Sequence, residues 1–196
     1  MNRKRTAVLI SGRGSNLQAL IDACAQADFP AQIALVVSNV AEAEGLARAK
    51  AAGIATRVIP HKDFASREAF DGAIDAALRE AGIEYVCLAG FMRILSDRFV
   101  TSWEGRLINI HPSLLPAFKG TNVHRRTLEA GVTESGCTVH FVVPELDSGP
   151  IIAQAKVPVL PGDTVDALAE RILDEEHKLY PEGLRRVASG TVKLSG

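Results

Sequence analysis

Short apolar segments that alternate with helix-patterned segments constrain the fold of this chain more than any other feature. Residues 6–10, 33–37 and 85–88 are nearly unbroken apolar runs, as expected of strands that are buried on both faces. The segments between them carry apolar residues at helical spacing, for example Leu17 and Leu20. Strands that alternate with helices predict an α/β fold with a doubly wound, Rossmann-like and mostly parallel sheet.

The pattern changes toward the C-terminus. Residues 137–143 and 151–159 predict two strands joined by a short Pro/Gly turn, so we expect an antiparallel extension at one edge of the sheet. A helix is expected over residues 41–52, and Asp163 should cap a long final helix. No repeat or linker interrupts the chain, which predicts a single domain over residues 1–196. The remaining expected elements are strands 56–59 and 107–110 and helices that begin near Ser15, Ser66, Ser96 and His124.

Composition narrows the class of protein. The 22 basic and 23 acidic residues nearly cancel, so no global field would attract nucleic acid or an anionic membrane. No apolar stretch approaches the length of about 18 residues that a membrane span needs. The three cysteines, Cys24, Cys87 and Cys137, have no zinc-type spacing and predict buried reduced thiols in a cytoplasmic protein. The histidines form no HExxH motif, so we expect no metal site.

The loop after the first strand is rich in glycine. Gly12 and Gly14 let the backbone approach a ligand, and the following helix N-terminus would favour an anion such as a phosphate. Leu17 stands near the position where the dinucleotide fingerprint needs a third glycine, which argues against NAD. Residues 11–16 therefore predict either a monophosphate site or a simple Gly-rich turn with Ser15 or Asn16 as the helix cap.

The fifth strand ends in a polar pair. Asn109 and His111 are two residues apart, so an extended chain points both side chains the same way, and Pro112 keeps His111 out of the helical region. An amide donor beside an imidazole suits a carbonyl whose oxygen gains negative charge during a reaction. The alternative is a core histidine with a capping asparagine.

A third loop, residues 145–150, follows the strand predicted over residues 137–143. Its Asp-Ser-Gly-Pro segment is by itself a turn signal. The functional interpretation requires Asp147 to approach His111, because a nearby carboxylate stabilises an imidazolium.

With these loops considered together, the chain resembles the glycinamide ribonucleotide formyltransferases, a folate-dependent formyltransferase family of purine biosynthesis. The resemblance runs nearly end to end. The motifs that carry it are residues 8–16, 88–95, 109–116, 145–150, 154–159, 176–177 and 180–181.

The resemblance implies transfer of a formyl group from the co-substrate 10-formyltetrahydrofolate to the primary amine of glycinamide ribonucleotide, without a metal. It implies that Asn109, His111 and Asp147 are catalytic. The N-terminal half would hold the ribonucleotide and the C-terminal half the folate and the catalytic groups. The implied ribonucleotide residues are Gly12, Arg13, Gly14, Ser15, Asn16 and Glu176, with Glu176 at the ribose. The implied folate residues are Arg67, Met92, Arg93, Ile94, Leu95, Asn109, Val143, Pro144, Glu145, Leu146 and Asp147.

The chain departs from the family pattern in three places. Asn122 stands where relatives often have histidine, and Leu173 stands where some have a polar contact one turn before the ribose-binding glutamate. The third is Pro144, which is expected to rigidify the folate loop. None of these positions belongs to the implied catalytic residues. The implied partners are small-molecule substrates, with no nucleic acid or membrane, and the protein is expected to be a monomer or a weak homodimer.

Three other functions remain as alternatives. A formyltetrahydrofolate deformylase usually has an extra N-terminal domain, and the first strand by Thr6 leaves no room for one. A methionyl-tRNA formyltransferase needs a C-terminal tRNA-binding domain, whereas this chain is expected to end soon after its last helix. A non-catalytic phosphosugar-binding module would need the glycine loop but not the convergence of Asn109, His111 and Asp147.

Overall fold

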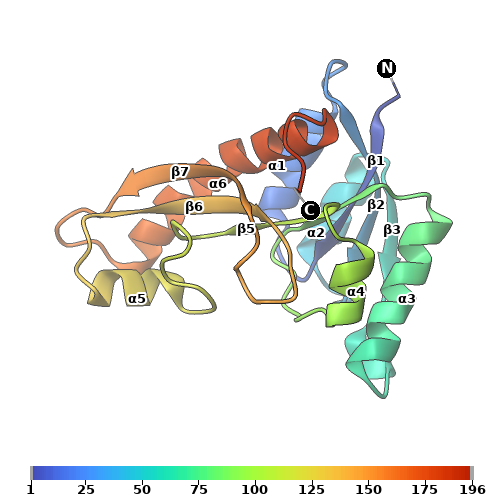
Figure 1. The fold of residues 1–196 in the computed structure, drawn as a ribbon, viewed down its shortest axis with the longest axis horizontal. Coiled ribbons are helices and arrows are strands. Elements are labelled where there is room, and N and C mark those ends of the chain that lie inside the picture. The colour runs from blue at the N-terminus through green and yellow to red at the C-terminus, as the bar shows by residue number, and fades with distance from the viewer. Residues whose placement is uncertain (1, 195–196) are drawn as a thin grey trace.

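A seven-stranded sheet forms the centre of the computed structural model, which describes residues 2–194 (Figure 1). The strand order is β3-β2-β1-β4-β5-β6-β7, with β1 to β5 parallel and the last two pairings antiparallel. This arrangement confirms the predicted α/β class and its antiparallel edge. The strands are β1 Lys4–Ile10, β2 Ala31–Ser38, β3 Ala55–Val58, β4 Tyr85–Leu88, β5 Leu107–His111, β6 Glu134–Phe141 and β7 Ile151–Pro158.

Helices cover both faces of the sheet (Figure 1). In β1, Val8 and Ile10 pack on one side with α1, α2 and α6, whereas Ala7 and Leu9 pack on the other with α3 and α4. This alternation explains the continuous apolar run, because a parallel strand between two helical layers has no solvent face. The helices are α1 Ser15–Cys24, α2 Glu44–Ala51, α3 Arg67–Glu80, α4 Asp97–Ser102, α5 Val123–Glu129 and α6 Val165–Ala188, and a short 3-10 helix, η1, spans His61–Asp63.

The start of α6 differs from the prediction. Thr164, not Asp163, is the N-cap, and its hydroxyl accepts a hydrogen bond from the Ala167 N–H at 3.1 Å. Asp163 instead accepts two hydrogen bonds from Arg171 and one from the Leu160 N–H. The Arg171 guanidinium is the main reason that the pKa of Asp163 falls to about 2. Asp163 therefore ties the preceding turn to the second turn of the helix.

Two other boundaries also shift. The helix predicted over residues 41–52 begins only at Glu44, because Ala43 is extended and acts as the N-cap. The strand predicted over residues 137–143 runs instead from Glu134 to Phe141. Val143 consequently belongs to the loop that carries Asp147, where its side chain is half-buried.

The strand order reverses beside β1, which lies between β2 and β4. Ligands of open α/β sheets bind beyond the carboxyl ends of the strands at such a point. Ser11 connects the loops there, because its hydroxyl accepts from the Met92 N–H at 2.8 Å and donates to the Asn39 carbonyl oxygen Oδ1 at 2.5 Å. The loops after β1, β2 and β4 are thus fixed to one another.

The single domain expected over residues 1–196 stays a prediction, and Met1, Ser195 and Gly196 lie outside the described residues. Among residues 2–194, no helix is long and apolar enough to cross a membrane. All three cysteines are buried and unpaired, as the sequence predicts.

Candidate active site

Asn109 and His111 lie at the carboxyl end of β5, and the structure brings Asp147 next to them. His111 Nδ1 lies 3.5 Å from Asp147 Oδ2, and both side chains are only 7% exposed. The other ring nitrogen, Nε2, donates to the Phe118 carbonyl oxygen at 2.9 Å, because a carbonyl can only accept. His111 is therefore held between a carboxylate and a backbone carbonyl.

The loop around Asp147 is shaped to present this carboxylate. Asp147 has a left-handed backbone with φ of 48°, a conformation that aspartate tolerates better than most residues. Its Oδ2 also accepts from the Gly120 N–H at 2.8 Å. A second contact, from the Lys119 ammonium to the Ser148 hydroxyl at 2.6 Å, joins the same two loops. Asp147 thus bridges β5 and the segment that follows it.

His140 is a member of this cluster that sequence reasoning missed. It lies directly across from Asn109 in the antiparallel β5–β6 pair, and its side chain is 2% exposed. Nδ1 donates to the Phe141 carbonyl at 2.9 Å, which leaves the Nε2 lone pair facing the Asn109 amide nitrogen at 3.4 Å. Burial is the main reason that the pKa of His140 lies below its usual value of 6.5, so the ring is neutral and can accept.

The sequence alone did not indicate that His140 belongs to the site, because the register between two paired strands cannot be predicted from the local sequence pattern. The strand predicted over residues 137–143 contains His140, but only its pairing with β5 places the ring against Asn109. His140 Nε2 is also 3.9 Å from Asp147 Oδ1. The site therefore contains four polar side chains rather than three.

The glycine loop leads into α1 as predicted. Gly14 is the N-cap of α1, with a left-handed φ of 73° and no side-chain cap. Neither Ser15 nor Asn16 therefore caps the helix, and both lie inside its first turn. The first N–H groups of a helix have no partner within it, so this end of α1 can bind an anion.

Asn16 and Glu176 meet although they are 160 residues apart in sequence. The Asn16 amide donates to Glu176 Oε2 at 2.9 Å. Burial raises the pKa of Glu176 above its usual 4.5, and the Asn16 bond opposes this shift only in part. The contact places a buried carboxylate from α6 beside the glycine loop.

The residues assigned to folate by resemblance fall into two groups. Met92, Ile94 and Leu146 are large apolar side chains that are 73%, 67% and 55% exposed. Leu95 is buried in the core layer with Phe99, so its side chain does not face solvent. Four further side chains of this set are exposed, namely Arg67, Arg93, Pro144 and Glu145.

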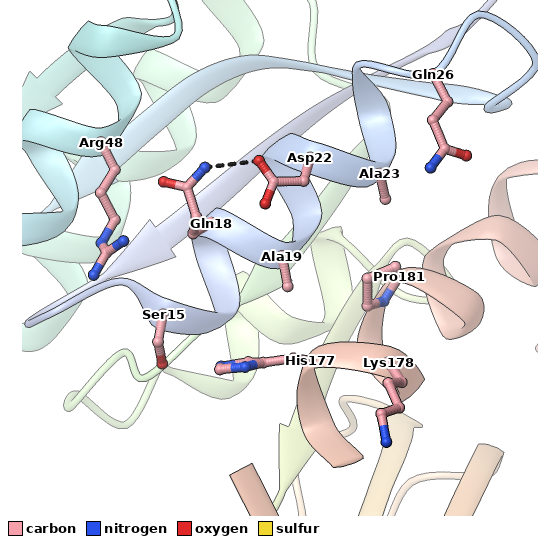
Figure 2. Close-up of a pocket in the computed structure, with 10 residues that line it drawn as sticks. All are labelled: Ser15, Gln18, Ala19, Asp22, Ala23, Gln26, Arg48, His177, Lys178 and Pro181. Carbon is pink, nitrogen blue, oxygen red and sulfur yellow. Dashed lines mark hydrogen bonds between the residues drawn. The ribbon is translucent and has the colours of Figure 1, made fainter. Parts of the chain in front are cut away.

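An open cavity of about 610 Å³ lies beside the glycine loop, between α1 and α6 (Figure 2). Ser15, Arg48, His177 and Lys178 contribute polar groups to its walls, together with Asp22. The catalytic candidates do not line it. Within residues 2–194, no group of three or more His, Cys, Asp or Glu side chains is arranged to hold a metal ion.

The doubly wound sheet places a glycine loop after its first strand and an Asn–His–Asp cluster at the carboxyl end of β5, an arrangement typical of enzymes of the α/β class. Residues 4–184 match the family model described as formyl transferase, and the chain belongs to that family. The match covers the glycine loop and the Asn109, His111 and Asp147 cluster alike.

Individual proteins within this family are similar to the chain over nearly its whole length. The chain is 50% identical over 187 residues to the phosphoribosylglycinamide formyltransferase of Escherichia coli K12. The aligned region covers 95% of this chain and 88% of that protein. It is 58% identical over 192 residues to the human trifunctional purine biosynthetic protein adenosine-3, covering 98% of this chain but only 19% of that protein. The crystal structure of phosphoribosylglycinamide formyltransferase from Brucella melitensis superposes with a TM-score of 0.92 at 54% identity, over 99% of this chain and 100% of that one.

Proposed function

We propose that this chain transfers the formyl group of 10-formyltetrahydrofolate to the primary amine of glycinamide ribonucleotide, a step of purine biosynthesis. The observation that carries the proposal is the buried cluster in which Asp147 faces His111 while His140 faces Asn109. A simple phosphosugar-binding module needs no such cluster.

Exposed apolar side chains support the folate assignment. Met92 and Ile94 from one loop and Leu146 from another present large apolar surfaces to solvent. An aromatic pterin ring is a ligand that would cover them, since removal of apolar area from water is favourable. The donor would be held by these side chains together with the backbone around Arg93 and Val143. It supplies an activated formyl carbon, and the chain supplies the surrounding polar groups.

Asn109 would stabilise the charge that develops on the formyl oxygen. When the amine adds to the formyl carbon, this oxygen becomes negative, and a fixed N–H donor lowers the barrier. His140 accepts one hydrogen of the Asn109 amide and so fixes the direction of the other. A donor that is already oriented has no reorganisation to undergo during the reaction.

His111 and Asp147 would act as a unit. Asp147 lies beside the His111 ring, and an imidazolium at this position would offer a second, charged donor to the formyl oxygen. His111 Nε2 is bonded to the Phe118 carbonyl in this structure, so this bond has to be exchanged for one to the substrate. Asp147, acting through a water, would help to carry the proton from the attacking nitrogen to the leaving nitrogen.

The acceptor would lie along α1 and α6. Its phosphate would bind the backbone of residues 12–16, and the ribose hydroxyls would donate to Glu176. The buried carboxylate needs such partners, because only Asn16 donates to it among the described residues.

The finer aspects of partners and location belong to the same proposal. The near-zero net charge of −1 favours small-molecule substrates over nucleic acid or membrane. We infer a cytoplasmic protein, because its three cysteines stay unpaired, and a monomer or weak homodimer.

One assay tests the proposed function against its alternatives. The protein is incubated with 10-formyltetrahydrofolate, with and without glycinamide ribonucleotide, and tetrahydrofolate release is followed. We expect release that depends on the ribonucleotide and persists in the presence of a chelator. Release without the amine would indicate a deformylase, and no release under either condition would contradict the proposal.

A further inference from the structure

Helix α2 contacts the glycine loop from behind at two successive carbonyl groups. The Gly45 N–H donates to the Gly12 carbonyl at 3.0 Å, and Arg48 Nε donates to the Arg13 carbonyl at 2.8 Å. Neither donor belongs to the loop, and α2 follows β2 rather than β1. The loop conformation is therefore set partly by a helix whose contacting side chain, Arg48, is 35 residues further along the chain.

These two bonds fix the direction of the loop N–H groups. In a planar trans peptide the carbonyl and the N–H point to opposite sides. The carbonyls of Gly12 and Arg13 point back to α2, so the N–H groups of Arg13 and Gly14 point away from it. These are the N–H groups that lead into the N-terminus of α1.

The contact between α2 and the loop leaves little room for a Cβ on either side. A Cβ on Gly14 would lie 2.7 Å from the Gly45 Cα, and a Cβ on Gly45 would lie 3.2 Å from the Gly14 Cα and 3.3 Å from the Gly12 carbonyl oxygen. Gly45 is buried, and Arg48 stands one turn further along the same helix. The helix and the loop thus form one packed unit.

Arg48 also brings charge to the mouth of the loop. Figure 2 shows Arg48 and His177 on either side of Ser15, at the wall of the cavity between α1 and α6. Burial is the main reason that the pKa of His177 is lowered, Asp174 raises it, and the positive charge of Arg48 lowers it further. Arg48 and His177 line the same cavity, so the Arg48 charge lies at the wall of that cavity.

We propose that Arg48 is a positioning residue for the acceptor phosphate: by holding the Arg13 carbonyl, its guanidinium keeps the loop N–H groups directed at the phosphate. The proposal rests on the phosphate site proposed above and adds a residue that is outside the glycine loop. Arg48 is not assigned a contact with the reacting atoms, so it affects acceptor binding and leaves the chemical step unchanged.

The test compares two acceptors that differ only in the phosphate, glycinamide ribonucleotide and its unphosphorylated riboside. For Arg48→Met we expect the ribonucleotide KM to rise about tenfold or more, since a hydrogen bond from a charged donor is lost. The riboside KM, the KM for 10-formyltetrahydrofolate and kcat should stay unchanged. Lys50→Met, on the exposed side of the same helix, is the matched control for loss of one positive charge and should change none of these.

Arg48→Lys separates position from charge. Lysine keeps the charge but lacks the fixed Nε donor, so the ribonucleotide KM should stay raised. A second measurement uses inorganic phosphate alone: it should raise the Tm of the wild-type protein and of Lys50→Met but not that of Arg48→Met. This readout also shows whether Arg48→Met is folded.

Several results would overturn the proposal. Full recovery of the ribonucleotide KM in Arg48→Lys would mean that charge alone suffices. An equal rise of the riboside KM in Arg48→Met would mean that the change acts on the fold and not on the phosphate. If the wild-type protein itself did not distinguish the two acceptors, the proposed phosphate site would be wrong, and the role of Arg48 would fall with it.

Discussion

At the scale of single residues, Asp147 is the side chain on which the candidate active site depends most. It lies within 3.5 Å of His111, accepts from the Gly120 N–H and faces His140. We expect Asp147→Asn to keep the shape but remove the charge, and to lower kcat by about 100- to 1,000-fold, the range found when one stabilising group of a transition state is lost. Steady-state kinetics with both substrates would measure this, with little change in either KM.

The double variant His111→Ala/Asp147→Asn distinguishes a catalytic pair from two separate residues. If the two side chains act as a unit, the double variant should be damaged little more than the worse single variant. Effects that simply multiply, or a near-normal kcat for Asp147→Asn, would leave Asp147 as no more than the residue of a turn.

Glu176 is a buried carboxylate whose proposed role in binding lowers the stability of the folded protein at neutral pH. Burial raises its pKa above 4.5, so the native state holds the proton more tightly than the unfolded chain. The resulting stabilisation is fully present below the unfolded pKa and is lost as the pH rises through the native one. We therefore expect Glu176→Gln to be more stable than the wild type at neutral pH, by a margin that disappears below about pH 4.

Urea unfolding at several pH values measures the difference in stability between Glu176→Gln and the wild type. Steady-state kinetics measure the loss of ribonucleotide binding in the same variant. The ribonucleotide KM of Glu176→Gln should rise about tenfold, because ribose hydroxyls bond more weakly to a neutral amide than to a carboxylate. A variant that is less stable at neutral pH would show that the Asn16 bond to the charged form outweighs the burial of that charge.

At the scale of elements, the packing of α2 on the glycine loop gives a prediction with an internal control. Gly14 and Gly53 both have left-handed backbones, with φ of 73° and 71°, but only Gly14 has backbone atoms of another element against its Cβ position. Alanine at either position should cost about 1 kcal/mol of backbone strain. Gly14→Ala should lose more than this, because α2 must move, and its ribonucleotide KM should also rise.

Denaturant unfolding of the two variants provides the comparison. Equal losses of stability for Gly14→Ala and Gly53→Ala, with an unchanged ribonucleotide KM, would show that the close approach of α2 to the loop has no role in binding.

The elements themselves show how far sequence alone can lead. The strand predicted over residues 85–88 agrees with β4 to the residue, because a run buried on both faces is a strong local signal. The first residues of the helices were harder to predict. No sequence feature excludes residues 41–43 from α2, and only the extended backbone of Ala43 shows that the helix begins at Glu44. Asp163 was wrongly predicted as the N-cap because Thr164, the next residue, can also cap a helix, and the Asp163 carboxylate accepts from Arg171 instead.

The candidate site likewise contains residues that the local sequence predicts and residues that it does not. Asn109 and His111 could be paired from the alternation of side chains along one strand. His140 and Arg48 could not be found in this way, because their contacts depend on strand register and on the position of a helix that follows another strand. Such contacts have no local sequence signature.

At the scale of the whole molecule, the three cysteines lie in two different clusters of the hydrophobic core. Cys24 and Cys87 belong to the apolar layer beneath α1, α2 and α6, whereas Cys137 packs with Leu168 and Ile172 near the start of α6. Helix α6 contributes to both clusters, since Tyr180 and Leu184 from its second half lie in the first. A helix shared in this way should make the two regions unfold together.

Thiol labelling tests that expectation and the prediction of a single domain. Burial raises the pKa of Cys24 and Cys137 to about 12 and that of Cys87 further, so no thiolate should be available in the native state at pH 8. With a disulfide reagent at increasing urea, all three thiols should become reactive with one common free energy of opening, equal to that of global unfolding. If Cys137 became reactive at lower urea than Cys24 and Cys87, the β6–β7 region would be a separate unit. The site between β5 and β6 would then lie at a boundary that opens independently, rather than inside one cooperative core.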